Sequence, residues 1–284
     1  MSKNFLDRIL CKHGVFNILK NDIYICNSLF KYGEWSELEV NLYKDIIKTN
    51  DIIIEVGSHI GSHTVPLAKI ANNGYLYAFE PQLLLFNLLN NNITENNISN
   101  IKTYLEAVSG NEDSIKLNQV DYKELYNNNN QINSGGIDFK ALISNNSGYE
   151  INVITLDNKF KHLKKLDFIK IDAEGNEFEV LKGSKDLISS LNPIIYFEFD
   201  PKKGIDTVQI LNFLESFNYI FYRHITPLFN FNNFNKSDVN IFPNISSFMI
   251  LSIPSSRLDV TLELMLYKNS CEKIIKSQAD NFLK

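Results

Sequence analysis

The sequence predicts an α/β fold with a mostly parallel sheet of seven strands, helices on both faces and an antiparallel hairpin at one edge. Short β-branched runs alternate with helix-length amphipathic segments over most of the 284 residues, as in βαβ units. The run 51–56 is apolar enough to be buried on both faces, like a central parallel strand. Two late extended runs, 219–222 and 246–253, fit the edge hairpin.

Turn residues set the limits of the expected elements. Gly57 ends the first strand, a turn at 72–74 ends the first helix, and Pro81 follows the second strand. Strands are expected at 51–56, 75–79, 101–108, 166–171, 194–199, 219–222 and 246–253. Helices are expected at 61–70, 83–92, 176–191, 207–217 and 257–284.

The alternation of strands and helices is interrupted once, between residues 110 and 165. This stretch contains an asparagine run and a turn-rich segment, and we interpret it as an insertion with a short strand or two. We therefore expect an N-terminal preface or lid at 1–50, one main domain at 51–255 and a helical tail at 256–284. The tail and the exposed sheet edge are candidates for a homodimer contact.

Composition excludes several classes of protein. The chain is 44% hydrophobic, so a packed core is expected, and its net charge of −5 argues against binding along a nucleic acid. The three cysteines are scattered, with no zinc or disulfide spacing. No run is long enough for a membrane span, and the first residues lack the apolar region of a signal peptide. We expect a cytoplasmic protein, and we assign its excess of asparagine to nucleotide composition.

The first strand–helix junction carries the clearest chemical signal. Glu55 precedes two glycines, Gly57 and Gly61, that lie four residues apart. Glycine lets a ligand approach the backbone, but the spacing is not the G-x-G-x-x-G of a dinucleotide site. An acid beside the loop repels a pyrophosphate and suits a ligand with an ammonium or sulfonium group. S-adenosylmethionine (SAM) is such a ligand.

Glu80 is the second part of the signal. It follows the second strand, where an acidic side chain can accept hydrogen bonds from both hydroxyls of a ribose. NAD enzymes place an acid similarly, and an acid after a strand is often only a helix cap. Glu55 and Glu80 together favour SAM over NAD.

An ordered set of short blocks resembles the FkbM-type SAM-dependent methyltransferases. The blocks lie at 33–37, 54–64, 78–81, 170–177, 180–183, 193–198, 226–230 and 240–243. The resemblance implies a Rossmann-like class I methyltransferase fold and O-methylation of a sugar, nucleotide sugar or glycan. Two positions depart from the family pattern: Glu55 stands where Asp is usual, and His59 where Asn is usual.

Candidates for removing the hydroxyl proton lie after the fourth and fifth strands. Asp172 and Glu174 follow one strand, and Glu198 lies in the next, so all three can face a crevice at the carboxyl ends of the sheet. His224, in a block that part of the family shares, is a fourth candidate base. Asp172 could instead cap a helix, and Glu198 could be a satisfied buried acid. Asp172 and Glu174 could also hold a divalent cation, but no dedicated metal spacing is present, so no metal is expected.

Further residues complete the expected cofactor site. His63 opens the first helix near the expected methionine end of SAM, Trp35 is a candidate lid, and the loop 133–136 is expected to touch the acceptor. The expected cofactor contacts are Glu37, Glu55, Gly57, Gly61, His63, Glu80, Glu106 and Ala107. Two other functions stay open: an NAD-linked nucleotide-sugar enzyme, and a non-catalytic binding protein with a methyltransferase fold.

Overall fold

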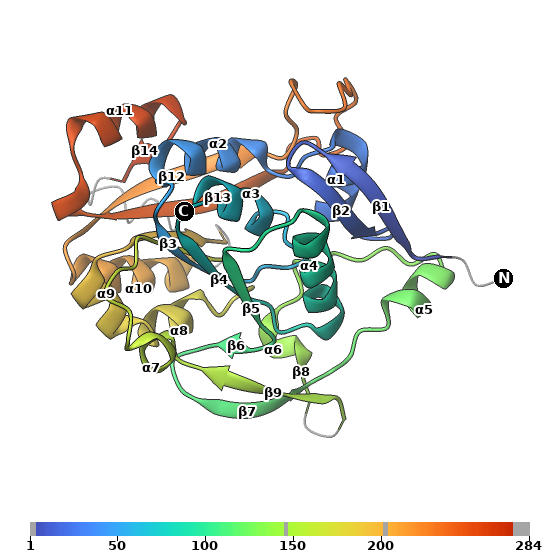
Figure 1. Ribbon diagram of the computed structural model, residues 1–284, viewed down its shortest axis with the longest axis horizontal. Coiled ribbons are helices and arrows are strands. Elements are labelled where there is room, and N and C mark those ends of the chain that lie inside the picture. The colour runs from blue at the N-terminus through green and yellow to red at the C-terminus, as the bar shows by residue number, and fades with distance from the viewer. Residues whose placement is uncertain (1–3, 145–146, 201–203, 275–284) are drawn as a thin grey trace.

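A single mixed sheet forms the centre of the molecule. The computed structural model describes residues 4–144, 147–200 and 204–274 (Figure 1). In spatial order the strands are β14, β12, β13, β11, β10, β3, β4 and β5, and the five from β11 to β5 run parallel. Their bounds are β3 Ile52–Val56, β4 Tyr75–Phe79, β5 Ile101–Tyr104, β10 Phe168–Ile171, β11 Ile194–Glu198, β12 Tyr219–Pro227, β13 Ser246–Pro254 and β14 Glu272–Lys273. The α/β class and the parallel core are confirmed.

The edge of the sheet differs from the expectation. The two-residue strand β14 pairs with β12, so the central sheet has eight strands instead of seven. The antiparallel pair β12–β13 is present, but β14 lies outside it and covers the edge. The region expected to be a helical tail holds, within its described part, the end of a 3-10 helix (Ser255–Arg257), one α-helix (α11, Val260–Lys268) and then β14. Residues 275–284 of that tail lie outside the described residues.

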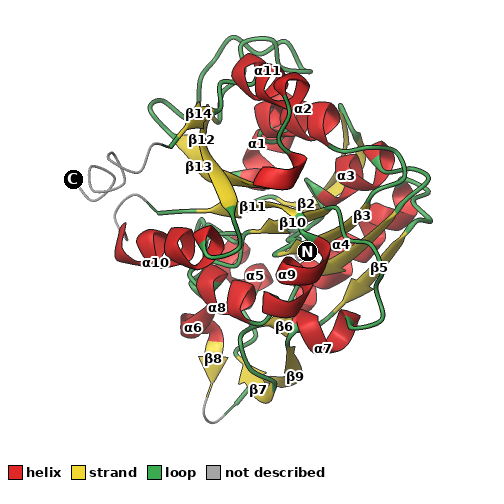
Figure 2. Cartoon of the chain, turned by 90° about the vertical axis from the view of Figure 1, so that its left-hand side faces the viewer, coloured by secondary structure: helices red, strands yellow, loops and turns green. Residues whose placement is uncertain are grey.

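Helices cover both faces of the sheet because successive strand residues point to opposite sides. Ile53 belongs to a core cluster with α2 (Glu37–Ile46), α3 (Thr64–Ile70) and α11. Ile54, the next residue, packs into the cluster on the other face. Figure 2 shows α2 and α11 above the sheet and α8 to α10 below it. The helices of the second face are α7 Leu156–Phe160, α8 Glu177–Lys182, α9 Lys185–Leu191 and α10 Gly204–Glu215.

The helix expected at 176–191 is two helices, α8 and α9, that meet at Gly183. A β-carbon at Gly183 would lie 2.1 Å from the carbonyl oxygen of Ser109. The close approach of these two backbone segments explains why a glycine occupies this junction.

The insertion contains more structure than expected. It supplies three strands, and with β6 these form a second sheet in the order β6, β9, β7, β8, visible at the bottom of Figure 1. The elements here are β6 Ala107–Val108, β7 Asp113–Leu117, α5 Tyr122–Asn127, α6 Phe139–Leu142, β8 Ile143–Ser144 and β9 Tyr149–Ile154. The single strand expected at 101–108 is therefore split between the two sheets.

The N-terminal segment folds as a hairpin followed by two helices. β1 (Leu6–Cys11) and β2 (Gly14–Leu19) pair with each other, and α1 (Ile25–Tyr32) and α2 follow. Buried Asn92 of α4 (Leu83–Glu95) accepts a hydrogen bond from the backbone N–H of Asn17 at 2.6 Å. Asn96 accepts one from Val15 at 3.0 Å, so two asparagines tie the hairpin to α4. In the described part of the chain, no helix is long and apolar enough to cross a membrane.

Candidate active site

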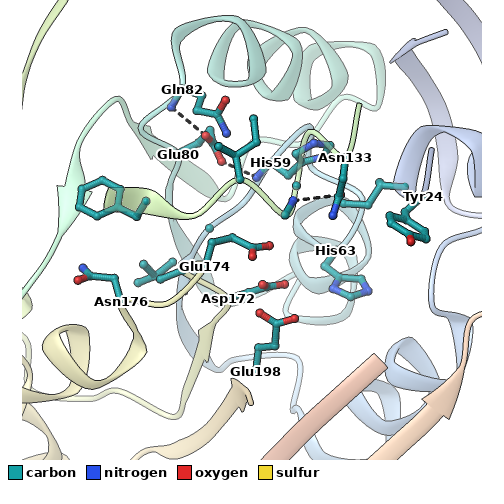
Figure 3. A pocket seen from close by; sticks show the side chains of 18 of the residues that line it. Tyr24, His59, His63, Glu80, Gln82, Asn133, Asp172, Glu174, Asn176 and Glu198 are labelled. Carbon is teal, nitrogen blue, oxygen red and sulfur yellow. Dashed lines mark hydrogen bonds between the residues drawn. The ribbon is translucent and has the colours of Figure 1, made fainter. Parts of the chain in front are cut away.

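A cavity of about 350 Å³ opens at the carboxyl ends of β3, β4, β10 and β11. Its walls come from four parts of the chain: the N-terminal segment, the strand ends, the insertion and the loop between β12 and β13. Figure 3 shows the side chains of some of the residues that line it. Eight residues expected from the sequence line it, namely Gly57, His63, Glu80, Glu106, Ala107, Asp172, Glu174 and Glu198. Trp35 and the loop residues Asn133, Gly135 and Gly136 also line it.

Gly57 lets the first loop of the site pass close to the end of β10. Its φ is +82°, and a β-carbon there would lie 1.7 Å from the carbonyl oxygen of Asp172. The backbone N–H groups of Gly57 and Ser58 both donate to the carbonyl of Phe79 at 3.0 Å. The loop is therefore fixed to the ends of both neighbouring strands.

Glu80 is held by backbone donors on both of its carboxylate oxygens. The N–H of His59 donates to Oε2 and the N–H of Gln82 to Oε1, each at 2.8 Å (dashed lines in Figure 3). Burial raises the pKa of this carboxyl to about 7. Each oxygen retains a lone pair, so the group can accept two further hydrogen bonds from a ligand.

Four residues that we expected in the site do not line the cavity. Glu55 is buried beneath the loop and accepts a hydrogen bond from the hydroxyl of Thr64 at 2.6 Å, and burial raises its pKa. A β-carbon at Gly61 would lie 2.9 Å from Leu89, on the side of α4. His224 lies within β12, and its Nδ1 is 2.7 Å from the hydroxyl of Tyr196.

Glu37, the fourth of these residues, belongs to a charge cluster at the start of α2. Its carboxylate lies 2.5 Å from His13, 3.0 Å from Lys44 and 3.1 Å from Lys12. Burial alone would raise the pKa of Glu37, but the His13 and Lys44 hydrogen bonds and charges outweigh it and hold the pKa at about 2. These contacts satisfy the carboxylate away from the cavity.

Three half-buried carboxylates meet at the strand ends. Asp172 follows β10, Glu198 ends β11, and Glu174 lies two residues after Asp172 with a left-handed backbone (φ +49°). Buried Lys170 donates to Oδ2 of Asp172 at 3.1 Å. Burial, together with the charges of Asp172 and Glu174, raises the pKa of Glu198 well above its usual range.

A hydrogen-bonded chain joins His59 to the N-terminal segment through the insertion. Nε2 of His59 lies 2.8 Å from the hydroxyl of Ser134, which in turn bonds to the carboxylate of Asp22. Because the Ser134 hydroxyl donates to Asp22, its oxygen accepts from Nε2–H of His59. Burial lowers the pKa of His59, and in the neutral ring Nδ1 is then an acceptor. It is buried, has no partner among the described residues and belongs to a side chain that lines the cavity.

Some residues of the site could not be found from the sequence. Asp22, Tyr24 and Glu39 come from the N-terminal segment and follow no strand, so no positional signal marks them. Tyr24 and Glu39 line the cavity, and Glu39 is buried there while accepting from Ser36 at 2.6 Å. Ser134 lies inside the loop that was expected to reach the site.

Replacing Ser134 with Ala is expected to lower the free energy of unfolding by about 1–3 kcal/mol, because Asp22 and His59 lose a shared partner inside the protein. Urea denaturation followed by circular dichroism measures the change. Ser147→Ala, at an exposed position of the same insertion, is the control. Equal free energies of unfolding for the two variants would show that the hydrogen bonds of the Ser134 hydroxyl contribute nothing to the stability of the fold.

Solved methyltransferase structures are among the proteins to which the chain is similar. The chain resembles a solved FkbM methyltransferase from Methylobacillus flagellatus KT (17% identity, TM-score 0.47); the match covers 72% of this chain and only 44% of that one. It also resembles M. jannaschii TYW2, solved with AdoMet (11% identity, TM-score 0.43, 89% and 87% of the two chains). A precorrin-6y C5,15-methyltransferase from Geobacter metallireducens shows 10% identity and a TM-score of 0.44, over 76% and 87%.

No curated protein sequence matches the chain. The sequence model of the methyltransferase FkbM domain matches residues 55–221, which is more than half of the 284 residues. This span contains the glycine loop, Glu80 and the three carboxylates. The chain therefore belongs to the FkbM methyltransferase family.

Proposed function

We propose that the protein is a SAM-dependent methyltransferase that transfers a methyl group to a hydroxyl of a sugar or glycan. The observation that carries the proposal is the buried carboxylate of Glu80, fixed at the end of β4 by two backbone N–H groups and lining the cavity. An acid at this place in an α/β sheet is suited to the two hydroxyls of an adenosine ribose.

The charges around the cavity fit SAM, whose sulfonium supplies an activated methyl group. Glu80, Glu106, Asp172, Glu174 and Glu198 all line the cavity, and an acidic lining favours a cationic ligand even though Glu106 and Asp172 each have a lysine partner. Nδ1 of His59 is an unused buried acceptor in the same wall, which suits a donor such as an ammonium group. The residues present therefore fit this cofactor.

The lining also supports a choice among acceptors. Among the described residues that line the cavity there is no lysine or arginine, the side chains that bind phosphate. A nucleotide sugar would bring a diphosphate against acidic walls, so a neutral sugar or glycan is favoured. Asn133 and Asn176 line the cavity as well and can bind hydroxyl groups.

Transfer to oxygen needs a base and in-line alignment. The acceptor oxygen forms a bond to the methyl carbon while the carbon–sulfur bond breaks, and the hydroxyl proton must leave. Asp172, Glu174 and Glu198 lie together at the strand ends, so an oxygen of this cluster takes the proton. A carboxyl whose pKa is raised is better matched to this task near neutral pH.

Calorimetric titration with S-adenosylhomocysteine (SAH) is the direct test, and we expect a single site per chain. Incubation with isotopically labelled SAM and a panel of neutral glycans and nucleotide sugars then reports transfer. Heat with NAD and none with SAH would contradict the cofactor assignment. SAH binding without transfer to any hydroxylated acceptor would support a non-catalytic binding protein instead.

A further inference from the structure

The three carboxylates at the strand ends have the spacing of a metal site. One ligand oxygen from each of Asp172, Glu174 and Glu198 lies within 4.8 Å of the other two. Oxygens on opposite sides of an ion are separated by twice the metal–oxygen distance. This oxygen–oxygen separation is about 4.2 Å for Mg²⁺ and about 4.8 Å for Ca²⁺. One ion can therefore contact all three carboxylates without a rearrangement of the backbone.

A buried lysine contacts one of the three carboxylates. Lys170 is buried below the cluster and donates to Asp172. Carboxylates this close together repel one another, and a divalent cation between the three oxygens would remove that repulsion.

His63 is an independent sign that a ligand belongs here. Its side chain is only 5% exposed and lines the same cavity, yet its Nε2 is buried without a hydrogen-bond partner among the described residues. In Figure 3 the His63 ring lies near Asp172, and the charges of Glu39 and Asp172 both act on it. Buried polar atoms are almost always satisfied, so an orphaned nitrogen in the wall of this cavity indicates a bound group with a polar atom.

We propose that Asp172, Glu174 and Glu198 bind one divalent cation, and that His63 contacts a water on that ion. Oxygen ligands from carboxylates select hard cations such as Mg²⁺, Mn²⁺ and Ca²⁺. The proposal that a metal binds here depends only on the geometry of these residues. The role of the metal in catalysis rests on the proposed function. In that role the ion holds the acceptor hydroxyl and lowers its pKa, and a carboxylate oxygen that is not on the ion takes the proton.

Titration of the full chain with Mn²⁺, followed by electron paramagnetic resonance, tests the site without any turnover. Bound Mn²⁺ loses the sharp signal of the free ion, so the spectrum gives stoichiometry and affinity. We expect one Mn²⁺ per chain, displaced by excess Mg²⁺ or Ca²⁺. Glu174→Gln and Glu198→Gln each weaken binding by about tenfold or more, since each removes a charged ligand.

Glu124→Gln is the matched control, because it removes the same charge at an exposed position of α5 and is expected to bind Mn²⁺ like the wild type. Circular dichroism confirms that the variants are folded. Absence of bound Mn²⁺ at about 1 mM, the weak end of protein sites, overturns the proposal. Equal affinity of the two cluster variants and the control overturns it as well.

A calorimetric titration with SAH in the presence of EDTA separates this proposal from the proposed function. SAH binding by a chain that does not bind Mn²⁺ overturns the metal site alone. Mn²⁺ binding by a chain that does not bind SAH supports the site and contradicts the methyltransferase assignment.

Discussion

Glu80→Gln is expected to lose most of the affinity for SAH. The carboxylate lines the cavity and its orientation is fixed by the N–H groups of His59 and Gln82, so a ligand hydroxyl meets a positioned, charged acceptor. A hydrogen bond to a charged group is worth about 1.5–3 kcal/mol, which corresponds to a roughly 10- to 150-fold loss of affinity. Calorimetry with wild type and variant measures this difference directly.

The pH dependence of SAH binding is a second test of the role of Glu80. The pKa of Glu80 is raised to about 7 in the protein without ligand, and the ribose hydroxyls require the ionised form. Affinity should therefore fall as the pH drops through 7, by about tenfold between pH 8 and pH 6. Glu80→Gln has no such group and should show a flat profile, while Glu124→Gln should follow the wild type. A wild-type affinity for SAH that does not change between pH 8 and pH 6 would show that Glu80 does not bind the ribose.

Gly57→Ala is expected to destabilise the fold by about 3–5 kcal/mol, at the upper end of single substitutions. The new β-carbon would overlap the carbonyl oxygen of Asp172, a backbone atom that cannot turn away, and φ is +82° there. Relief of this overlap must move the end of β10, so SAH binding should weaken together with stability. Thermal unfolding and calorimetry on the same sample report both effects.

Gly135→Ala is the control for that substitution. Gly135 also lines the cavity, but its β-carbon would meet the flexible end of Ile25 at 3.0 Å, and its φ is not in the left-handed region. We expect a loss within about 1 kcal/mol for this variant. If Gly57→Ala were as stable as Gly135→Ala, the close approach of the two strand ends would not be a determinant of the fold.

The parallel part of the fold follows from sequence because its signals are local. Each of β3, β4, β10 and β11 is an apolar run ended by a turn or an acid, and the carboxyl ends of such strands necessarily share one edge of the sheet. For this reason the amino-acid sequence alone is enough to place Glu80, Asp172 and Glu198 together. The role of each remains a prediction.

The parts that sequence missed depend on contacts between distant segments. Asp22 is linked to the cavity through His59 and Ser134, the latter more than a hundred residues later, and nothing in the local pattern encodes that pairing. Asn92 and Asn96 belong to an excess that we assigned to nucleotide composition, yet both anchor the N-terminal hairpin. Likewise β14 is only two residues long, too short to show a period.

The position of β13 has a consequence for the order in which the chain is made. This strand, Ser246–Pro254, lies between β11 and β12, both of which precede it in the sequence. During synthesis the open edge of β11 cannot be covered by its native neighbour until residue 254 has left the ribosome. Until then a growing chain carries an unpaired strand edge and a cavity without its Ser246, Ser247 and Met249 wall. The molecule thus gains protection from edge-to-edge association, and the complete wall of its cavity, only after residue 254 has been made.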